Sequence, residues 1–583
     1  MSQDAFLNVE LSLSGRRWIG PTAEELRQAE AIQQVSGLDQ ATARILAARG
    51  IPPGETESFL SPKLRDLMPD PRKLKDLEKA ANRLVTAVKH KNRIAIFADY
   101  DVDGGSSAAL LLDWLRQQGR GATLYVPDRI DEGYGPNPPA MRALAEAHDL
   151  IVCVDCGTLS FDAIAAAKGA DVVIIDHHLA EIELPEALAI VNPNRQDETG
   201  DLAHLCAAAV VFLVLVEANR QARAAGQTPP DLMAMLDLVA LATVADVAPL
   251  VGLNRALVTQ GLKVMSARRR PGLAALADVA GLDTPPAAYH LGYVIGPRVN
   301  AGGRVGRADL GARCLAATDP DEARALADRL DELNRDRREI EAQVRDAALA
   351  QAEERGLEGP LVWAAGKNWH PGVVGIVAAR LKEATHRPAV VIGLENGEGK
   401  GSGRSVRGVD LGTAVQTLAA EGLLIKGGGH KMAAGLTVAA DKIEPAMERL
   451  GALLARQGAG DSGPRDLRID AALMPGAATV ELVTQIEAAG PFGQSAPAPR
   501  FAFPDVQILH ARQVGTGHLK VSFGDGLGAK LEAIAFDGWT NALGEALSQN
   551  RGQRFHLVGR LGINHWGGRQ SVELRLEDAA PSE

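Results

Sequence analysis

Three aspartates at alternate positions, Asp99, Asp101 and Asp103, open the part of the sequence that could do chemistry. They follow the apolar run 94–98, which predicts a buried strand, and precede the Ala/Leu-rich segment 107–117, which predicts a helix. If the backbone stays extended between them, all three carboxylates point to one side. Carboxylates that lie so near to one another repel unless a cation neutralises them or one of them takes a proton. The run therefore indicates either a solvated acidic turn or part of a metal site.

Two further apolar runs end in residue types that bind metals. Asp155 follows the run 150–154, and Asp-His-His at 176–178 follows the run 172–175. In a parallel α/β sheet, the residues just past the carboxyl ends of the strands meet in one crevice. Each motif alone could be an ordinary turn, whereas three in succession, all at predicted strand ends, favour a shared metal cluster. Oxygen ligands with one imidazole and no thiolate suit Mn²⁺ or Mg²⁺ better than zinc.

The elements that must position these residues follow an alternating pattern. From residue 94 to about 194, apolar runs alternate with Ala-rich helical stretches, which predicts βαβ units and a parallel sheet. No Gly-x-Gly-x-x-Gly follows a strand there, so we do not expect a dinucleotide site. Residues 319–355 place apolar residues at helical spacing among dense charge, which predicts one long helix connecting two lobes. A coiled-coil dimer arm is the alternative, although its heptads are poor.

Two more regions follow the predicted long helix. Residues 360–435 carry nine Lys or Arg against five Asp or Glu, a local balance of +4 in a chain of net charge −11. The glycine-rich runs at 401–405 and 427–435 let backbone amides approach a phosphate chain, although such runs are often plain turns. Beyond a linker at 458–464, short alternating runs separated by Gly/Asp turns predict a small β-barrel.

The composition sets further bounds on the protein. With 583 residues, 46% of them hydrophobic and 23% charged, the chain suits a soluble protein of several domains. It has no run of 18 apolar residues and no signal-peptide pattern, so we expect a cytoplasmic protein with no membrane contact. Four cysteines are too few for a disulfide framework. The negative net charge argues against indiscriminate coating of nucleic acid, so a DNA-processing function requires local basic surfaces.

Four motifs resemble, in order, those of the DHH phosphoesterases. They are Asp-Tyr-Asp-Val-Asp-Gly at 99–104, Val-Asp-Cys-Gly at 154–157, Asp-His-His at 176–178 and Ala-Thr-Val-Ala-Asp at 242–246. Nearly the whole chain is similar to the branch of this family that comprises single-strand-specific exonucleases. The resemblance implies an α/β fold with a parallel-sheet DHH domain, a long connector helix, a second α/β DHHA1 domain and a C-terminal OB-like β-barrel. The expected boundaries are 1–90 for an N-terminal helical region, 91–317 for the DHH domain, 318–357 for the connector, 358–456 for DHHA1 and 465–580 for the barrel.

The resemblance also implies the residues of an active centre. Two divalent cations, Mn²⁺ or Mg²⁺, would be held by five carboxylates and one imidazole: Asp99, Asp101, Asp103, Asp155, His177 and Asp246. The residues with catalytic roles would be Asp101, Asp103, Asp155, His177, His178 and Asp246. Asp176 and His178 would orient His177 or contact the phosphate. Two cations in such a centre can generate hydroxide and stabilise both the attacking and the leaving oxygen.

Loops outside the carboxylate cluster are expected to hold the substrate. The residues implied by the resemblance are Arg129, Tyr134, Asn300, Arg304, Ser402, Arg404 and His430. Arg129 would hold a phosphate and Tyr134 would stack on a base, whereas Ser402 and Arg404 would anchor the 5′ end. In the barrel, the candidates for binding a single strand are Lys520, Arg560, Trp566 and Arg569. At 494–496, Gln-Ser-Ala stands where the family pattern has x-Gly-Asn, and we expect an altered turn there rather than altered catalysis.

Together these features predict an exonuclease that degrades single-stranded DNA from 5′ to 3′ into mononucleotides by two-metal phosphodiester hydrolysis. The resemblance implies a role in recombination and in mismatch or base repair, with single-strand-binding protein and repair helicases as partners. We expect a monomer, because no dimer seam is evident in the sequence. Two alternatives stay open: a DHH phosphodiesterase acting on short oligonucleotides or cyclic dinucleotides, and a catalytically inert DNA-binding scaffold of replication or repair.

Overall fold

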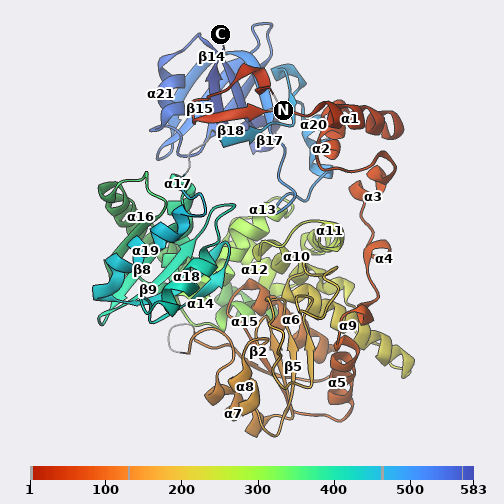
Figure 1. Ribbon diagram of the computed structural model, residues 1–583. Coiled ribbons are helices and arrows are strands. Elements are labelled where there is room, and N and C mark those ends of the chain that lie inside the picture. The colour runs from red at the N-terminus through yellow and green to blue at the C-terminus, as the bar shows by residue number, and fades with distance from the viewer. Residues whose placement is uncertain (1–3, 129–131, 461–464, 567–568, 583) are drawn as a thin grey trace. The chain divides into compact units, whose positions relative to one another are not determined.

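The computed structural model describes residues 4–128, 132–460, 465–566 and 569–582. The chain divides into two compact units (Figure 1). The larger unit comprises Pro69–Ala248 and Gln260–Ser462, and the smaller unit comprises Met1–Met68, Pro249–Thr259 and Gly463–Glu583. Among the described residues, no helix is both long and apolar enough to cross a membrane.

A five-stranded parallel sheet of order β3-β2-β4-β5-β6 lies in the larger unit and confirms the predicted α/β fold. Its strands are β2 (Ile94–Ala98), β3 (Thr123–Tyr125), β4 (Leu150–Val154), β5 (Asp171–Ile175) and β6 (Ala189–Val191). Every residue of β2 and β4 is buried, as in strands that are covered on both faces. Ala98 pairs with Val154, and Val154 pairs with Ile175. The chain therefore leaves these three strands at one level of the sheet edge.

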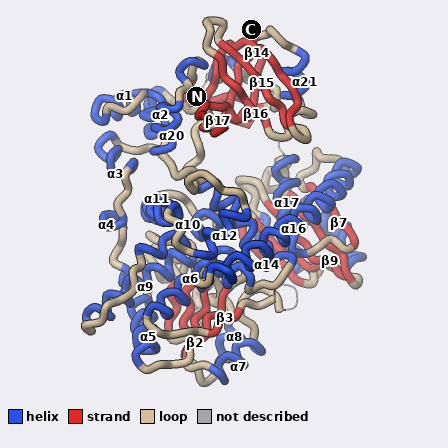
Figure 2. The backbone as a smooth tube through the Cα atoms, turned by 180° about the vertical axis from the view of Figure 1, so that it is seen from behind, coloured by secondary structure: helices blue, strands red, loops and turns tan. Residues whose placement is uncertain are grey.

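Helices cover both faces of this sheet (Figure 2). They are α5 (Leu77–Lys89), α6 (Val102–Gln117), α7 (Pro138–Ala147), α8 (Phe161–Ala166) and α9 (Ala207–Ala224), and α10 (Leu236–Ala245) packs on α6 and α9. Met141 of α7 and Ile164 of α8 join one core with Phe97 and Ile151 of the strands. On the other face, α6 contacts β2 and β4, and α9 contacts β5. This packing holds the N-termini of α6 and α9 near the carboxyl edge of the sheet.

The predicted long helix is α16 (Pro320–Arg355), which has Asp319 as its N-cap. It packs against α12 (Pro271–Val279), α14 (Gly296–Val305) and α17 (Pro371–Thr385). Its buried apolar residues, which run from Ala323 to Ala352, face these neighbours. Its apolar stripe is therefore covered inside the larger unit.

A second sheet follows α16 in the order β10-β11-β9-β8-β7. Its elements are β7 (Val362–Lys367), β8 (Ala389–Glu395), β9 (Glu398–Arg404), β10 (Lys426–His430), β11 (Ala433–Ala439), α18 (Leu411–Ala420) and α19 (Ile443–Ala455). Only β7 and β8 are parallel; the other neighbours pair antiparallel. This mixed α/β lobe occupies the stretch expected to form the second α/β domain.

A closed five-stranded barrel forms most of the smaller unit. Its strands are β14 (Phe501–Val514), β15 (His518–Gly524), β16 (Lys530–Ala535), β17 (Arg554–Trp566) and β18 (Arg569–Pro581), and β14 closes it by pairing with β17. Helices α1 (Ala23–Ser36), α2 (Gln40–Ala48) and α20 (Val480–Ala488) lie beside the barrel (Figure 1). Residues of all three belong to its hydrophobic core. In addition, β1 (Arg16–Ile19) pairs with β12 (Arg465–Arg468). The first helices of the chain therefore belong with its last strands, whereas α5 belongs to the larger unit.

The segment Pro249–Thr259 belongs to the smaller unit although it begins three residues after Asp246. The amide of Leu250 donates a hydrogen bond to the carbonyl of Gln494 (2.9 Å). Nε of Arg255 donates to the carbonyl of Phe59 (3.1 Å), and its guanidinium lies 3.9 Å from the centre of the Phe59 ring. This short stretch is thus held by both ends of the sequence.

A tight turn occupies the position where the sequence departs from the family pattern. Gly493 and Ala496 exchange two backbone hydrogen bonds of 2.9 and 3.1 Å. Between them, Ser495 adopts a left-handed backbone conformation with φ 58°. That region of φ favours glycine, so Ser495 holds local backbone strain.

Candidate metal centre

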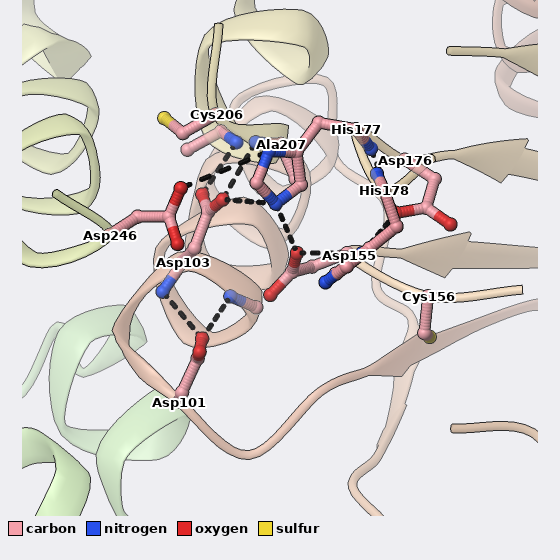
Figure 3. Close-up of polar contacts among 12 residues, drawn as sticks. Asp101, Asp103, Asp155, Cys156, Asp176, His177, His178, Cys206, Ala207 and Asp246 are labelled. Atoms are coloured by element: carbon pink, nitrogen blue, oxygen red, sulfur yellow. Dashed lines mark hydrogen bonds and ion pairs between the residues drawn. The ribbon is translucent and has the colours of Figure 1, made fainter. Parts of the chain in front are cut away.

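Acidic and imidazole side chains from four elements meet at the carboxyl edge of the parallel sheet (Figure 3). Nε2 of His177 lies 3.3 Å from Oδ1 of Asp155 and 3.7 Å from Oδ2 of Asp103, and its Nδ1 lies 3.8 Å from Oδ2 of Asp246. Among the described residues, three groups have ligand atoms within 4.8 Å of one another: Asp99, Asp101 and Asp155; Asp103, His177 and Asp246; and Asp155, His177 and His178. All six residues expected to hold the cations are thus brought together.

The aspartates after β2 converge through a helix start rather than through an extended run. Helix α6 begins at Val102, and Asp101 is its N-cap, accepting hydrogen bonds from the amides of Asp103 (2.8 Å) and Gly104 (3.1 Å). The three aspartates therefore do not lie on one extended run, because the cap starts α6 five residues before the helix start predicted from the apolar pattern. A Cβ at Gly104 would lie 2.4 Å from the carbonyl oxygen of Asp99, so this first turn requires glycine.

Asp103 is buried against the N-terminus of α9. Its two oxygens accept hydrogen bonds from the amides of Ala207 (2.7 Å) and Ala208 (2.8 Å). Burial raises the pKa of Asp103, although the neighbouring His177 and the two amides act in the opposite direction. The free N–H groups and the helix dipole favour a negative charge at this position. They fix the carboxylate without neutralising it, which leaves it able to bind a cation.

Asp155 is the most constrained of the acidic residues. It has φ 60°, an uncommon conformation for a residue other than glycine that often marks functional sites. Its Oδ1 is buried and accepts no hydrogen bond within the described structure. Burial, followed by the charges of Asp103 and Asp101, raises the pKa of Asp155 well above its ordinary value. A buried carboxylate oxygen without a donor, surrounded by other carboxylates, fits a cation site.

Asp246 completes the cluster from the C-terminus of α10. Burial and the charges of Asp103 and Asp101 raise its pKa to about 8. The carbonyl end of a helix disfavours a carboxylate, which adds to the cost of this placement. A divalent cation removes the penalty, because it attracts all of these carboxylates at once.

Asp176 and His178 form a supporting pair beside the cluster. Oδ1 of Asp176 accepts from Nδ1 of His178 (2.8 Å) and from the amide of His177 (2.8 Å), and its Oδ2 accepts from the hydroxyl of Thr158 (2.7 Å). These bonds outweigh the effect of burial and lower the pKa of Asp176. Burial alone would lower the pKa of His178, but Asp176 raises it to about 9. Asp176 thus orients the two histidines and holds a proton on one of them.

The loop expected to reach the substrate is described from residue 132 onward, and Arg129 lies outside the described residues. The hydroxyl of Tyr134 donates to the carbonyl of Asp155 (3.2 Å) and lies 3.2 Å from Nε2 of His178. Its ring is about half exposed. Tyr134 therefore lies at the rim of the centre.

Two predicted substrate residues join α14 to its neighbours. Oδ1 of Asn300 accepts from the amide of Val102 (3.0 Å), at the first turn of α6. Nη1 of Arg304 donates to the carbonyl of Gly372 (3.1 Å), at the start of α17. Asn300 thus aligns α14 with the helix that carries Asp103, and Arg304 aligns α14 with α17.

The predicted 5′-end residues lie on the second sheet. Nη1 of Arg404 donates to the hydroxyl of Ser402 (3.0 Å) on β9. A Cβ at Gly375 of α17 would lie 3.1 Å from Oγ of Ser402 and 3.2 Å from Nη2 of Arg404, so glycine leaves room for both side chains. His430 is exposed at the end of β10, and its backbone pairs with Ala433, which in turn pairs with Arg404.

The barrel residues proposed to grip a strand are partly engaged within the protein. Lys520 lies 3.7 Å from both Glu532 and Glu573, and Arg560 forms an ion pair with Glu577 (2.6 Å). Arg569 is exposed, and the side chain of Trp566 lies outside the described part of the chain.

Several residues that support the centre were not predicted from the sequence. The amides of Ala207 and Ala208 hold Asp103, and Nδ2 of Asn192 donates to the hydroxyl of Thr158 (3.0 Å) and to the carbonyl of His178 (2.8 Å). Asn192 directly follows β6, so the rule that polar residues past strand ends meet in one crevice could have found it. The helix amides carry no comparable signal in the sequence.

Family models match three parts of the chain: the N-terminal domain of the DHH family at 93–243, the DHHA1 domain at 358–456 and the RecJ OB domain at 469–578. The single-stranded-DNA-specific exonuclease RecJ of Escherichia coli is 36% identical over 560 residues, covering 92% of this chain and 95% of that protein. The RecJ of Bacillus subtilis is 33% identical, covering 93% of this chain and 68% of that protein.

Solved structures give the same picture. A crystal structure of RecJ from Thermus thermophilus in complex with Mn²⁺ superposes with a TM-score of 0.80 at 30% identity, covering 97% of this chain and 80% of that one. The same enzyme in complex with Mg²⁺ gives a TM-score of 0.73 at 28% identity, covering 97% of this chain and 78% of that one.

Proposed function

The chain belongs to the RecJ family of DHH phosphoesterases, and from this membership we propose how it acts. It is a metal-dependent exonuclease specific for single-stranded DNA, as its relatives are named. We propose further that it removes mononucleotides from the 5′ end. The observation that supports this most strongly is the convergence of Asp103, Asp155 and Asp246 around His177, with a buried Asp155 oxygen that lacks a donor.

Two divalent cations, Mn²⁺ or Mg²⁺, are the cofactors that this centre fits, and both occur in the related crystal structures. We assign them to the six residues that meet there: Asp99, Asp101, Asp103, Asp155, His177 and Asp246. When bound, such cations activate water and offset the charge of the phosphate being cleaved. The donor set of five carboxylates and one imidazole suits these hard cations.

The protein's own groups position the reaction. The α9 amides hold Asp103 toward the centre, and Asp176 fixes the two histidines. With a pKa of about 9, His178 carries a proton at neutral pH, and its Nε2 lies beside the hydroxyl of Tyr134. We propose that His178 donates to an oxygen of the scissile phosphate and thereby fixes its orientation, while the ring of Tyr134 stacks on a base.

The second lobe supplies cationic contacts to the strand. Its excess of Lys and Arg offers the local basic surface that a chain of net charge −11 needs for DNA. We propose that Ser402 and Arg404 bind the 5′ phosphate, because a guanidinium and a hydroxyl 3.0 Å apart can share one phosphate group. We assign Arg304, Asn300, His430 and Arg129 to the backbone of the strand. This capture of one free end accounts for exonuclease rather than endonuclease action.

Similarity over nearly the whole length of RecJ does not favour the alternatives of a phosphodiesterase for short oligonucleotides or cyclic dinucleotides, or an inert scaffold. We propose that the protein acts as a monomer in the cytoplasm, in recombination and repair, together with single-strand-binding protein and helicases.

Timed digestion of end-labelled oligonucleotides tests the function. With Mn²⁺ or Mg²⁺, we expect a 5′-phosphorylated single strand to be degraded from its 5′ end, a blunt duplex to persist, and a chelator to stop the reaction. Asp155→Asn should reduce kcat by about a thousandfold or more, because it removes a charged group from the reacting centre. Asp171→Asn, which changes an exposed aspartate at the opposite end of β5, should retain activity. Full activity of the Asp155 variant would refute the mechanism.

A further inference from the structure

Two exposed tyrosines stack on each other just before α14. Tyr289 lies in α13 (Ala288–His290), and Tyr293 lies in the π-helical turn η5 (Leu291–Ile295). Their side chains are 52% and 74% exposed. The ring centroids lie 5.2 Å apart, and the planes are inclined by only 23°. A nearly parallel pair of rings in solvent presents flat aromatic faces that a further planar group can extend.

The turn that carries these rings packs against the helix that ends at the metal centre. A Cβ at Gly292 would lie 3.4 Å from Cγ1 of Val244, and a Cβ at Gly296 would lie 3.4 Å from Cβ of Ala245. Val244 and Ala245 directly precede Asp246. The two glycines therefore allow η5 to lie close against the last turn of α10. The tyrosine pair is positioned by the same backbone that positions a predicted cation ligand.

Polar contacts hold the turn at both ends. Nη1 of Arg298 donates to the carbonyl of Val294 (2.7 Å), while its Nε donates to Asp331 of α16 (2.9 Å). At the other end, Nδ1 of His290 accepts from the amide of Ala287 (3.0 Å). A π-helical turn is rare and frequently occurs at functional sites. The turn thus presents its two rings from a fixed base and not from a free loop.

We propose that Tyr289 and Tyr293 form a stacking platform for bases of the single strand whose backbone is cleaved at the metal centre. This inference rests on the proposed function and adds a base-binding subsite to it. Every base has a π-face, so stacking on tyrosine grips a strand without reading its sequence, as a degradative exonuclease requires. The bases of a duplex are already stacked on both faces, so the platform also favours single strands.

The test compares a 5′-phosphorylated thymidine strand with strands of equal length in which one nucleotide at a time is replaced by an abasic spacer. For the unmodified protein, we expect an abasic replacement at one or two consecutive positions near the 5′ end to raise KM about fivefold or more. In a Tyr289→Leu, Tyr293→Leu double variant, this difference between the two strands should disappear. The separate Tyr293→Phe variant keeps the aromatic ring and should therefore retain the difference in KM between the two strands.

Met233→Ala serves as a matched control, because Met233 is about half exposed beside the opposite end of α10 and should leave digestion unchanged. If the double variant does not fold, the single Tyr293→Leu change provides the same comparison. Discrimination that persists in the folded leucine variants, or that is absent from the unmodified protein, would overturn the platform. Equilibrium binding of both strands is also measured in chelator, where no digestion occurs. A difference in binding affinity between the strands would support the platform even if the proposed nuclease function failed.

Discussion

Asp155 combines several features that lower the stability of the fold. Its backbone is left-handed, one of its oxygens lacks a donor, and its pKa is raised by burial and by Asp103 and Asp101. Each feature costs folding free energy when no cation is present. These features fit the proposed role of Asp155 as a cation ligand and are not explained by a contribution to the fold.

This reasoning predicts the effect of metal on thermal unfolding. In chelator, Asp155→Asn should raise the melting temperature by a few degrees, because it relieves repulsion among buried carboxylates. Added Mn²⁺ should raise the melting temperature of the unmodified protein but have much less effect on the variant. Differential scanning calorimetry with and without Mn²⁺ measures both changes. A variant that melts earlier than the unmodified protein in chelator would contradict the account.

Arg404 gives a second prediction at this scale. Arg404→Gln should raise KM for a 5′-phosphorylated strand by about ten- to a hundredfold, because a charge-assisted contact to the phosphate is lost. A strand with a 5′-hydroxyl should be affected much less. Arg407→Gln, an exposed change three residues further on, is the matched control and should affect both strands equally, because it removes a basic charge that is not proposed to bind the 5′ phosphate. Equal losses on both strands would argue that Arg404 does not bind the 5′ phosphate.

At the scale of elements, the core strands could be predicted because each is a short apolar run that is buried on both faces. The runs at 94–98 and 150–154 match β2 and β4. The acidic and histidine residues that directly follow the predicted strands then pointed to Asp99, Asp155 and the Asp-His-His motif. Helix α6 begins earlier than predicted, because Asp101 caps it and Gly104 allows its first turn to pass close to Asp99. The α9 amides that hold Asp103 could not be predicted, since that contact joins residues about a hundred positions apart.

The turn at 493–496 yields a prediction for one element. Ser495→Gly should stabilise the smaller unit by about 0.5–1 kcal/mol, because relief of left-handed strain exceeds the entropy that glycine loses on folding. Ser495→Ala should give no such gain, since alanine meets the same strain. Chemical denaturation followed by a probe of the barrel measures the difference. A glycine variant no more stable than the alanine variant would show that the turn is not strained.

At the scale of the whole molecule, the grouping of α1 and α2 with the barrel could not be foreseen. Their contacts join residues more than 400 positions apart, and no local pattern encodes such a pairing. The distribution of charged residues in the sequence did indicate where positive charge is concentrated. With a net charge of −11 and a local excess of +4 over residues 360–435, the proposed binding of DNA would depend on a confined basic surface.

Binding through such a surface should depend strongly on salt. The KM for a single strand should rise steeply between 50 and 200 mM NaCl, with a slope on logarithmic axes set by the number of phosphate contacts. Arg404→Gln should lower that slope by about one contact, whereas Met233→Ala should not change it. Steady-state kinetics over a salt series measures both slopes. A KM independent of salt would exclude a dominant role for the phosphate backbone in binding.

The segment Pro249–Thr259 sets a limit on how this protein can be dissected. It leaves α10 just after Asp246 and is then held by Phe59 from the start of the chain and by Gln494 from near its end. Without the barrel, the hydrogen bond from Leu250 to Gln494 would be lost, four residues after the proposed cation ligand Asp246. We therefore expect removal of the barrel to loosen residues 249–251, whereas residues 252–259 begin a helix, α11 (Gly252–Ser266), that continues into the larger unit.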